Sequence, residues 1–422
     1  MYQVENSGDL LRSRAAHLRS RLWPTIGANV FLLGLTSLLT DVSVEMVTTT
    51  LPLYMVLGLR LAPLQLGVID GLYQGAAALV QVASGLLADR WRRRKALAVA
   101  GYAFSALCKL GFLLIGANWM ALAGVVVLDR IGKGIRTAPR DALIAASAPP
   151  ERLGIAFGVH RSMDTAGAMV GPLIATALLL LTVNQYDTIF VVSFCFAVTG
   201  LSVIVFLVKD PQPPAQHQSE FVGSMATIHL LLKQRAFRRV VFASGALALV
   251  TMSDSLVYLA LRRSPLGHAA TFPALYVGTA LVFMALAIPI GRLADRIGRR
   301  QVFGIGYGVL VLVYCVLLTP HSSLAILGVV IGLGFYYAAT DGVLMAHVSN
   351  LLPDAVRTVG LAIVITGVSL SRLCASIAYG VLWQWWGADV ATQVFVAGLL
   401  LVLTIVSIVA YSAQGERGAH AV

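Results

Sequence analysis

The sequence predicts an all-α membrane protein with twelve transmembrane helices, arranged as two six-helix halves related by pseudo-twofold symmetry. Composition is the first indication: of 422 residues, 58% are hydrophobic and 12% are charged, and the mean hydropathy is +0.83. Soluble domains contain about 25% charged residues, so a chain this apolar belongs in lipid. A series of apolar runs and an internal repeat are the other two indications.

Apolar runs of helix length occur along the whole chain. About 20 such residues are needed to cross roughly 30 Å of hydrocarbon as a helix. The predicted spans are 28–57, 65–88, 96–115, 118–147, 154–181, 187–208, 240–261, 271–291, 302–318, 322–349, 355–383 and 388–412.

These spans divide the chain into a cytoplasmic N-terminal segment at 1–24, a six-helix half at 25–208, a cytoplasmic linker at 209–238, a second half at 239–412 and a cytoplasmic tail at 413–422. The linker begins with a stretch rich in Pro and Gln, and a short amphipathic helix is predicted from Met225. Arg and Lys gather in alternate connections. The positive-inside rule therefore predicts a multi-pass protein of the inner (cytoplasmic) membrane with both termini in the cytoplasm.

Two segments of the chain repeat each other. "GLLADRWRRRK" at 85–95 recurs as "GRLADRIGRRQ" at 291–301, each after the second span of its half. "TDVSVEM" in the first span has a weaker echo in "MSDSLVY" of the seventh, which places Asp41 opposite Asp254. Duplicated halves of this kind are typical of secondary transporters, whose substrate site lies between the halves.

The repeated segment resembles motif A of the major facilitator superfamily, and the resemblance extends over roughly residues 25–412. It implies the superfamily fold, with a latch that holds the outward-facing state and breaks when the protein opens inward. Glycine at this position is expected to let neighbouring helices approach closely. The residues that the resemblance assigns to the latch are Gly85, Asp89, Arg90, Arg93, Arg94, Gly291, Asp295, Arg296, Arg299 and Arg300.

Span 4 contains "DRIGKGIRTAPRD" at 129–141, where Arg130-x-x-x-Gly134-x-x-x-Ala138 resembles motif B. In the family this arginine lies within the membrane and is linked to proton transfer. An ionised side chain at the centre of a bilayer costs about 2.5–3.5 kcal/mol on insertion scales, so Arg130 is expected to face a partner or a water-filled cavity. The alternative is that the helix ends near Gly134 and the later charges lie in a solvated loop.

Span 5 contains Gly167-x-x-x-Gly171-Pro172, which resembles part of motif C. The family associates this motif with antiporters, chiefly drug/proton exporters, and the resemblance assigns a hinge to Gly167, Gly171 and Pro172. A general packing face of small residues is the alternative interpretation.

Each helix that lines the central cavity in the superfamily fold carries an acidic residue here. Asp41 and Glu45 share one face of span 1, because they are four residues apart. A buried carboxylate near a movable cation is what proton coupling requires, although a static ion-pair network is the alternative. The predicted proton-coupling residues are Asp41, Glu45, Asp129, Arg130 and Asp254. The predicted cavity residues are Asp41, Glu45, Arg130, Lys133, Arg136, Asp164, Asp254, Tyr258, Tyr336, Asp341 and Arg372.

The motifs of enzymes are missing from the sequence. It contains no P-loop, no HExxH and no Cys/His ligand spacing, so catalysis, a metal and a cofactor are not expected. The net charge of +12 lies in short loops rather than on one basic face, which excludes nucleic acid as a partner. The expected partners are a small-molecule substrate, protons and the lipid bilayer, and the expected protein is monomeric.

The predicted function is proton-coupled efflux of a small organic solute by alternating access. Proton-coupled uptake of an anionic metabolite is one alternative, because Arg130, Lys133, Arg136 and Arg372 lie within spans. A transporter-like sensor that carries no flux is another.

Overall fold

The computed structural model describes residues 27–91, 94–116, 118–149, 152–182, 185–210, 225–261, 272–319 and 322–419. The backbone alone is described at 79, 81–91, 225–228, 354–355, 358 and 410–419. Within these ranges the secondary structure is helical and no strand is present. The predictions for the segment 1–24 and for residues 211–224 of the linker lie outside the described residues.

The first half consists of six long helices, two of which end in a π-helical turn. Their bounds are α2 (Ala28–Leu53) with η2 (Tyr54–Gly58), α3 (Pro63–Trp91), α4 (Arg94–Leu114), α5 (Trp119–Ala146), α6 (Leu153–Leu181), and α7 (Tyr186–Ser202) with η4 (Val203–Leu207). Asn118 caps α5, because its side-chain oxygen accepts from the backbone N–H groups of Met120 and Ala121.

The second half begins with the short helix α8 (Met225–Lys233), at the place predicted for a surface helix. The helices that follow are α9 (Arg235–Leu249), α10 (Asp254–Leu261), α11 (Phe272–Ile297), α12 (Arg299–Leu317), α13 (Ser323–Leu351) and α14 (Asp354–Ala419). Gly387 interrupts α14 with φ of 86°, a backbone conformation that side chains other than glycine adopt at a cost. This break falls between the predicted spans 355–383 and 388–412.

The predicted span 240–261 lies within one candidate membrane span, Arg235–Leu261, but its helix is interrupted, because residues 250–253 are not helical. The break is stabilised by side chains. The backbone N–H of Met252 donates to the Tyr314 hydroxyl at 2.6 Å, and the Thr251 hydroxyl donates to the carbonyl of Leu247. The break makes Asp254 the first residue of α10, so its side chain lies at a helix start within the bundle.

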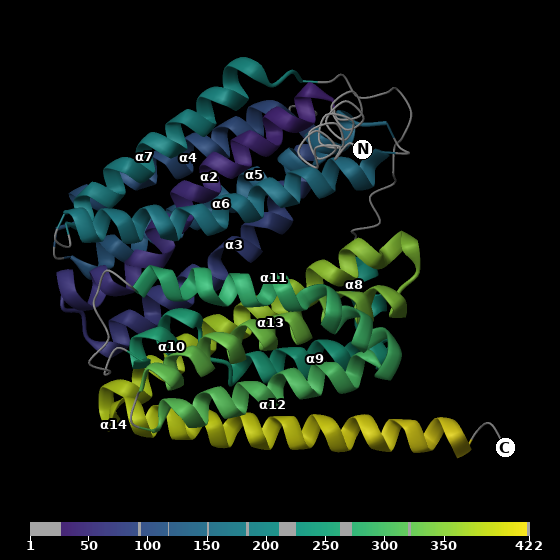
Figure 1. Ribbon diagram of the computed structural model, residues 1–422. Helices are drawn as coiled ribbons and strands as arrows, with labels where there is room; N and C mark the ends of the chain where they lie inside the picture. Colours follow the sequence, from purple (N-terminus) through teal and green to yellow (C-terminus); the bar gives the residue numbers. More distant parts are fainter. Residues whose placement is uncertain are drawn as a thin grey trace, which may run out of the picture.

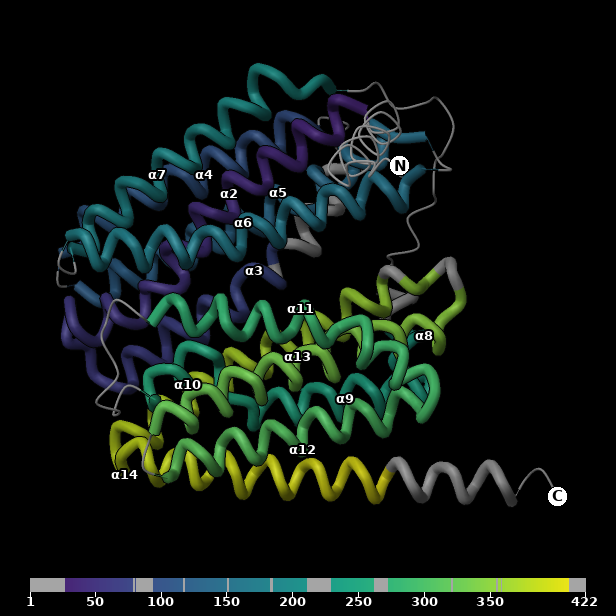
Figure 2. Tube along the Cα trace, in the orientation of Figure 1, coloured from purple at the N-terminus to yellow at the C-terminus, as the bar shows by residue number. Residues whose placement is uncertain are grey.

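The helices form two groups, one above the other in Figure 1. Helices α2 and α4–α7 form one group, helices α9–α14 form the other, and α3 extends toward the second group (Figure 2). We call the end of the bundle where η4 ends and α8 begins the linker end, and the opposite end the far end. At the linker end the Asn29 amide donates to Ser147 and to the carbonyl of Lys209, which joins α2, α5 and η4.

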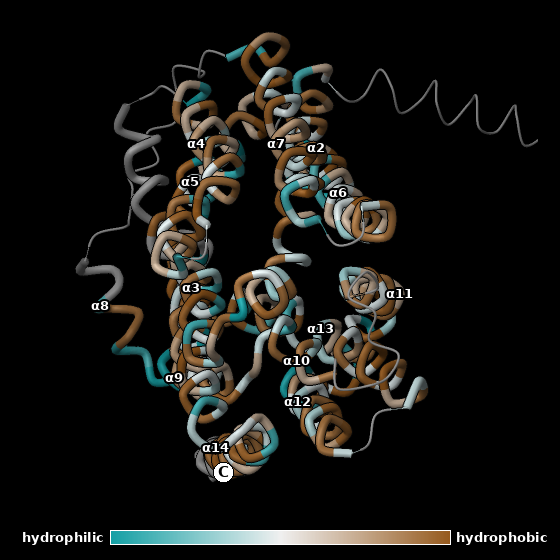
Figure 3. Tube along the Cα trace, turned by 90° about the vertical axis from the view of Figure 1, so that its left-hand side faces the viewer, coloured by the Kyte–Doolittle hydropathy of each residue, from teal (hydrophilic) through white to brown (hydrophobic). Residues whose placement is uncertain are grey.

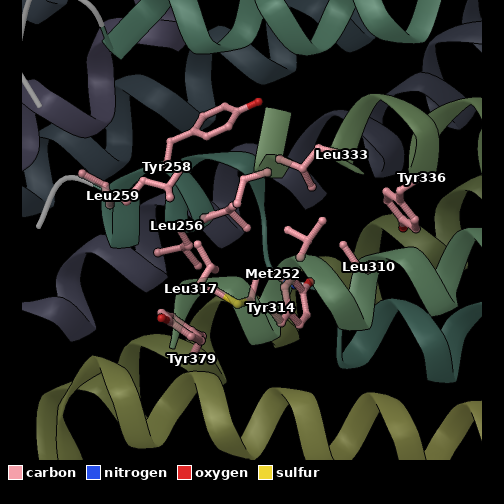
Figure 4. Packing of buried hydrophobic residues seen from close by; sticks show 14 of the residues in the cluster. Met252, Leu256, Tyr258, Leu259, Leu310, Tyr314, Leu317, Leu333, Tyr336 and Tyr379 are labelled. Carbon is pink, nitrogen blue, oxygen red and sulfur yellow. The ribbon is translucent and has the colours of Figure 1, made fainter. Parts of the chain in front are cut away.

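The two halves meet chiefly along α3 and α14, and again where α11 contacts α6 and α2. Figure 3 looks along the bundle and shows α3 and the α6–α11 pair as two separate junctions between the groups. A core cluster at the far end joins Met46 and Leu179 of the first half to Leu256, Leu261 and Phe272 of the second. Figure 4 shows the second-half side of this cluster, where Met252, Leu256 and Tyr314 lie close together.

At the linker end, by contrast, Asp341 and Gly342 of α13 are exposed. The two halves are therefore in contact at the far end, whereas Asp341 is exposed toward the linker end.

Nine helices in the described part of the chain are long and apolar enough to cross a membrane. Helix α5 is not among them, since it carries Asp129, Arg130, Lys133 and Arg136 within its apolar stretch. Helix α14 counts as one candidate although it contains two predicted spans. The count of twelve spans and the pseudo-twofold symmetry remain predictions.

Candidate functional site

Helix α5 contains the whole charged segment at 129–141. It is continuous from Trp119 to Ala146, so the alternative of a loop after Gly134 is wrong. Glycines allow this helix to pack closely: a Cβ on Gly134 would lie 2.8 Å from Cβ of Val80 on α3. The charged side chains are consequently held inside the first half, where Asp129, Arg130 and Arg136 are all buried.

A fully buried ionic cluster surrounds Asp129. One of its oxygens accepts from Lys109 Nζ at 2.8 Å and from the Ser105 hydroxyl at 2.7 Å, both on α4. The other accepts from Arg130 at 2.5 Å. The Lys109 side chain is only 1% exposed and that of Asp129 only 4%. A carboxylate that is bound by two cations and a hydroxyl is stabilised in its ionised form, so Asp129 is a fixed anion that positions Arg130.

The guanidinium of Arg130 also stacks on an aromatic ring. Its Cζ lies 4.1 Å from the ring centroid of Tyr73 on α3, a cation–π geometry. The Tyr73 hydroxyl shares a hydrogen bond of 2.6 Å with Thr48 of α2. Arg136 makes a similar contact with Tyr102, at 4.7 Å. Rings from α3 and α4 thus hold the two arginines of α5, and α2 holds the ring of Tyr73 through Thr48.

Asp41 and Glu45 lie side by side on α2 and face the cations of α5. Glu45 is within electrostatic range of Lys133 and Arg130, and Asp41 is within range of Lys133 and Arg136. Both side chains are partly exposed. Asp41 also interacts with Asp164 of α6, so two carboxyl groups are neighbours here.

The glycines of α6 determine how closely this helix packs against α2. A Cβ on Gly167 would lie 2.5 Å from the carbonyl oxygen of Leu38, and one on Gly171 would lie 2.7 Å from that of Val42. The same added Cβ atoms would lie 3.1 and 3.0 Å from the Cβ atoms of Asp41 and Glu45. Helix α6 is continuous through Pro172. The structure thus gives these glycines a packing function beside the acidic pair, and the predicted hinge is untested.

A second group of charges lies nearer the linker end. Arg140 donates to Asp141 and to the Ser37 hydroxyl, and it lies 4.0 Å from Asp164. His160 is 3.9 Å from the same oxygen of Asp164. Within the described residues neither ring nitrogen of His160 has a hydrogen-bond partner.

The second half has fewer charges and more tyrosines. Asp254 accepts a hydrogen bond of 2.5 Å from the Tyr337 hydroxyl. Arg372 lies within electrostatic range of Asp254 and Asp341 and among the tyrosines of α12 and α13. In the part of the chain that is described, the Nε of Arg372 is buried and has no hydrogen-bond partner.

Tyr258 and Tyr336 do not line an exposed surface in this conformation. They are 0% and 1% exposed and belong to the far-end core cluster. The Tyr258 hydroxyl bonds to Thr279 at 2.6 Å. Aromatic side chains with a hydrogen-bond partner are readily buried, and in this conformation these two tyrosines form part of the core. Their assignment to the cavity stays a prediction.

The second copy of the predicted latch is described, and most of the first is not. Asp295 pairs with Arg299 at 3.1 Å, and Arg299 also donates to the carbonyl of Ala346. Arg296 and Arg300 are exposed. A Cβ on Gly291 would meet no described atom within 4 Å, so close helix packing at Gly291 is not observed. Arg94 is half-buried, and the side chains of Gly85, Asp89, Arg90 and Arg93 lie outside the described residues.

Lys109 and Ser105 of α4 and Asp70 of α3 are among the buried polar residues that sequence reasoning missed. Lys109 and Asp70 each interrupt an apolar run, which is the signal that could have identified them. Within the described ranges there is no group of three or more His, Cys, Asp or Glu placed to hold a metal ion.

Known proteins resemble this chain in sequence and in fold. An uncharacterised MFS-type transporter of Methanocaldococcus jannaschii is 32% identical over 372 residues, which cover 85% of this chain and 89% of that protein. The multidrug resistance protein MdtG of Serratia proteamaculans is 26% identical, over 77% of this chain and 78% of its own length. The crystal structure of a mutant of the nucleoside transporter NupG superposes with a TM-score of 0.77 at 14% identity, covering 90% of this chain and 99% of that one.

The likeness to NupG concerns the fold alone. The model of the Major Facilitator Superfamily matches residues 33–277 and 244–419, which together span most of the chain. With this match, and with a relative at 32% identity over most of both chains, the protein is a transporter of the Major Facilitator Superfamily and not an enzyme.

Proposed function

We propose that this transporter exports a small organic solute across the cytoplasmic membrane in exchange for protons. In this proposal twelve spans form two six-helix halves that rock about a central cavity, the linker end faces the cytoplasm, and the protein acts as a monomer. The observation that carries the proposal is the pair Asp41 and Glu45, which faces the cations of α5. Within the described residues neither carboxylate forms a close ion pair, in contrast to Asp129.

The pair differs from Asp129 in a way that suits coupling. Asp129 is bound by Lys109, Ser105 and Arg130 and is shielded from water. Asp41 and Glu45 are partly exposed, so a proton can reach them. A carboxylate near Lys133 and Arg130 changes its proton affinity when those cations approach or recede. Asp41 and Glu45 are therefore the proposed proton carriers, with Arg130 held in position by Asp129.

The exchange cycle follows from this arrangement. Protonation of Asp41 or Glu45 from the far side weakens attraction to the α5 cations and favours release of the solute. The halves then rock, and the proton leaves to the linker side as the next solute binds. Asp254 and Arg372 in the second half are the proposed contacts for the solute, along with Asp341 at the exposed linker end of the cavity.

The direction of transport is supported by relatives rather than by geometry. MdtG is named a multidrug resistance protein, and a relative from Streptococcus pneumoniae is named a multi-drug resistance efflux pump. The close α2–α6 packing at Gly167 and Gly171 adds support, because this partial motif resembles that of antiporters.

Flux through purified protein in liposomes tests the proposal. A solute found by a thermal-shift screen is loaded inside, and a pH jump acidifies the side equivalent to the far end. The parent is expected to expel the solute against its gradient. Asp41→Asn and Glu45→Gln are expected to lose this pH-driven flux and to keep exchange of labelled for unlabelled solute, which needs no net proton transfer. Asp187→Asn, at an exposed carboxylate in the first turn of α7, is the matched control.

Uptake of an anionic solute is the second candidate. The observation that favours it is a set of buried arginine nitrogens, Arg130 Nε, Arg136 Nη1 and Arg372 Nε, which lack hydrogen-bond partners among the described residues. An anionic group could accept from such donors. Uptake predicts accumulation of an anion when the outside is acidified. Expulsion of the solute under the same pH jump rules it out.

A further inference from the structure

Asp70 is a buried carboxylate at the junction between the two halves. It lies on α3 of the first half and is only 5% exposed. Its Oδ2 accepts a hydrogen bond of 2.7 Å from the Ser376 hydroxyl on α14, which is 1% exposed. The hydroxyls of Ser253 and Ser255, beside the break before α10, also interact with it. Every one of these partners belongs to the second half.

The backbones of α3 and α14 are in direct contact at this point. A Cβ on Gly67 would lie 2.5 Å from the carbonyl oxygen of Ser376, and one on Gly71 would lie 2.7 Å from that of Leu373. Glycine at both positions is therefore needed for Asp70 to reach across the junction. The contact belongs to the far-end part of α3, whose first residue is Pro63.

The surroundings of Asp70 contain no described cation within ion-pairing distance. Asp254 and Tyr276 of α11 are both within electrostatic range of Asp70. The Tyr276 hydroxyl donates to Ser255, so the hydroxyl partners are themselves held in place. A buried carboxylate stabilised by hydroxyl donors alone loses its stabilisation as soon as those donors withdraw.

We propose that Asp70, with Ser376, Ser253 and Ser255, forms a lock that keeps the far end closed and that has to break whenever the far end opens. Each opening moves α3 away from α14, which removes the hydroxyl donors and exposes the carboxylate to water. Closing restores the hydrogen bonds and displaces no counter-ion. The lock uses a carboxylate and hydroxyls, whereas the described latch copy at the linker end uses the ion pair of Asp295 and Arg299.

The experiment measures opening of each end by cysteine labelling, in a background from which the four native cysteines have been removed. Leu256→Cys reports on the far end, since Leu256 is 1% exposed and packs in the core cluster that joins the halves. Gly342→Cys reports on the linker end, where an added Cβ meets no described atom within 4 Å. A membrane-impermeant maleimide is applied to the protein in lipid nanodiscs.

Ser376→Ala is expected to raise the labelling rate of Leu256→Cys by about ten- to a hundredfold, the effect of losing one hydrogen bond to a charged group. The rate at Gly342→Cys is expected to fall, because alternating access closes one end as the other opens. Asp70→Asn keeps an acceptor oxygen and is expected to give a smaller increase, about fivefold, the difference between a charged and a neutral hydrogen bond. The matched control is Ser193→Ala: Ser193 bonds to Ser43 at 2.9 Å, both are fully buried, and both belong to the first half.

An unchanged rate at Leu256→Cys in Ser376→Ala overturns the proposal. So does an equal increase in Ser193→Ala, or a faster rate at Leu256→Cys with no change at Gly342→Cys, since both indicate general loosening. Asp70→Asn and Ser376→Ala are small changes, and a single peak in size-exclusion chromatography establishes that they fold. The proposal rests on the alternating access of the proposed function. Its measurement uses neither solute nor pH gradient, so failure of the lock is distinguishable from failure of proton-coupled export.

Discussion

The two halves of this transporter hold their buried charges in different ways. In the first half five basic side chains, Lys109, Arg130, Lys133, Arg136 and Arg140, lie among the acidic side chains Asp41, Glu45, Asp129 and Asp164, and Asp70 lies apart from them at the junction with α14. In the described part of the second half Asp254 and Asp341 lie near Arg372, and the Tyr337 hydroxyl donates to Asp254. The first half is ionic and the second is aromatic.

This difference suggests a division of tasks between halves that share one fold. A dense ionic cluster can change its protonation while its total charge stays close to balanced, which suits proton coupling. An aromatic half with few charges suits contact with an organic solute. The comparison can be tested by making equivalent changes in both halves, and the following predictions do so.

Removal of the fixed anion is expected to have the largest effect. Asp129→Asn leaves Lys109 and Arg130 buried without a counter-charge, and breaking a buried pair in this way costs about 3–5 kcal/mol. Asp254→Asn keeps an acceptor for the Tyr337 hydroxyl and is expected to cost about 1 kcal/mol, the difference between a charged and a neutral hydrogen bond. Unfolding titrations in mixed micelles measure both values.

A double variant serves as the control for this prediction. Lys109→Met combined with Asp129→Asn leaves one buried cation, which is the net charge of the parent cluster, so it is expected to recover part of the lost stability. If Asp129→Asn and Asp254→Asn lower the free energy of unfolding equally, the two halves do not differ in how strongly their stability depends on a buried carboxylate.

The position of the ionic cluster could be predicted from the sequence because charges inside an apolar run are rare. Arg130 and Asp129 interrupt a helix-length apolar stretch, and the cost of ionised groups in lipid requires that they face partners. The same reasoning applied to Lys109 in "SALCKLGFLL" and to Asp70 in "GVIDGLYQG" would have identified both. The buried charged residues and the helices that carry them can thus be identified from the sequence alone.

The partners of these residues could not be predicted from the sequence in the same way. Tyr73, Ser105 and Ser376 are common residue types with no local signature, and their positions opposite a charge depend on how helices pack. The break at 250–253 was missed for a related reason: its backbone groups are satisfied by Tyr314, which is distant in the sequence. Apolar periodicity alone predicts a continuous helix there.

Loss of a tyrosine hydroxyl is expected to cost more stability in the second half than in the first, the reverse of the order expected for the asparagine variants. Tyr337→Phe removes the donor to the Asp254 carboxylate and is expected to cost about 1.5–3 kcal/mol, as for a hydrogen bond to a charged group. Tyr73→Phe keeps the ring under Arg130 and loses only a neutral bond to Thr48, for about 0.5–1.5 kcal/mol. The same micelle titration compares them, and a Tyr73→Phe cost above that of Tyr337→Phe contradicts the assignment of hydroxyl stabilisation to the second half.

Glycine substitution compares the packing of the two halves rather than their charge. Gly171→Ala in α6 places a methyl group 2.7 Å from the carbonyl oxygen of Val42, a backbone atom that cannot turn aside. Overpacking of this kind costs about 1–3 kcal/mol. The added methyl also meets Cβ of Glu45 at 3.0 Å, so pH-driven flux is expected to fall together with stability.

The matched change in the second half is Gly291→Ala, where no described atom lies within 4 Å of the added methyl. A glycine inside a helix is less favourable than alanine by about 0.8–1 kcal/mol, so this variant is expected to be as stable as the parent or slightly more stable. Thermal unfolding in detergent and flux in liposomes are measured on both variants. If Gly291→Ala slows flux while it leaves stability unchanged, a state other than this one must bring α11 close to a neighbour. The latch that motif A predicts would then act through Gly291 in the conformation that is closed at the linker end.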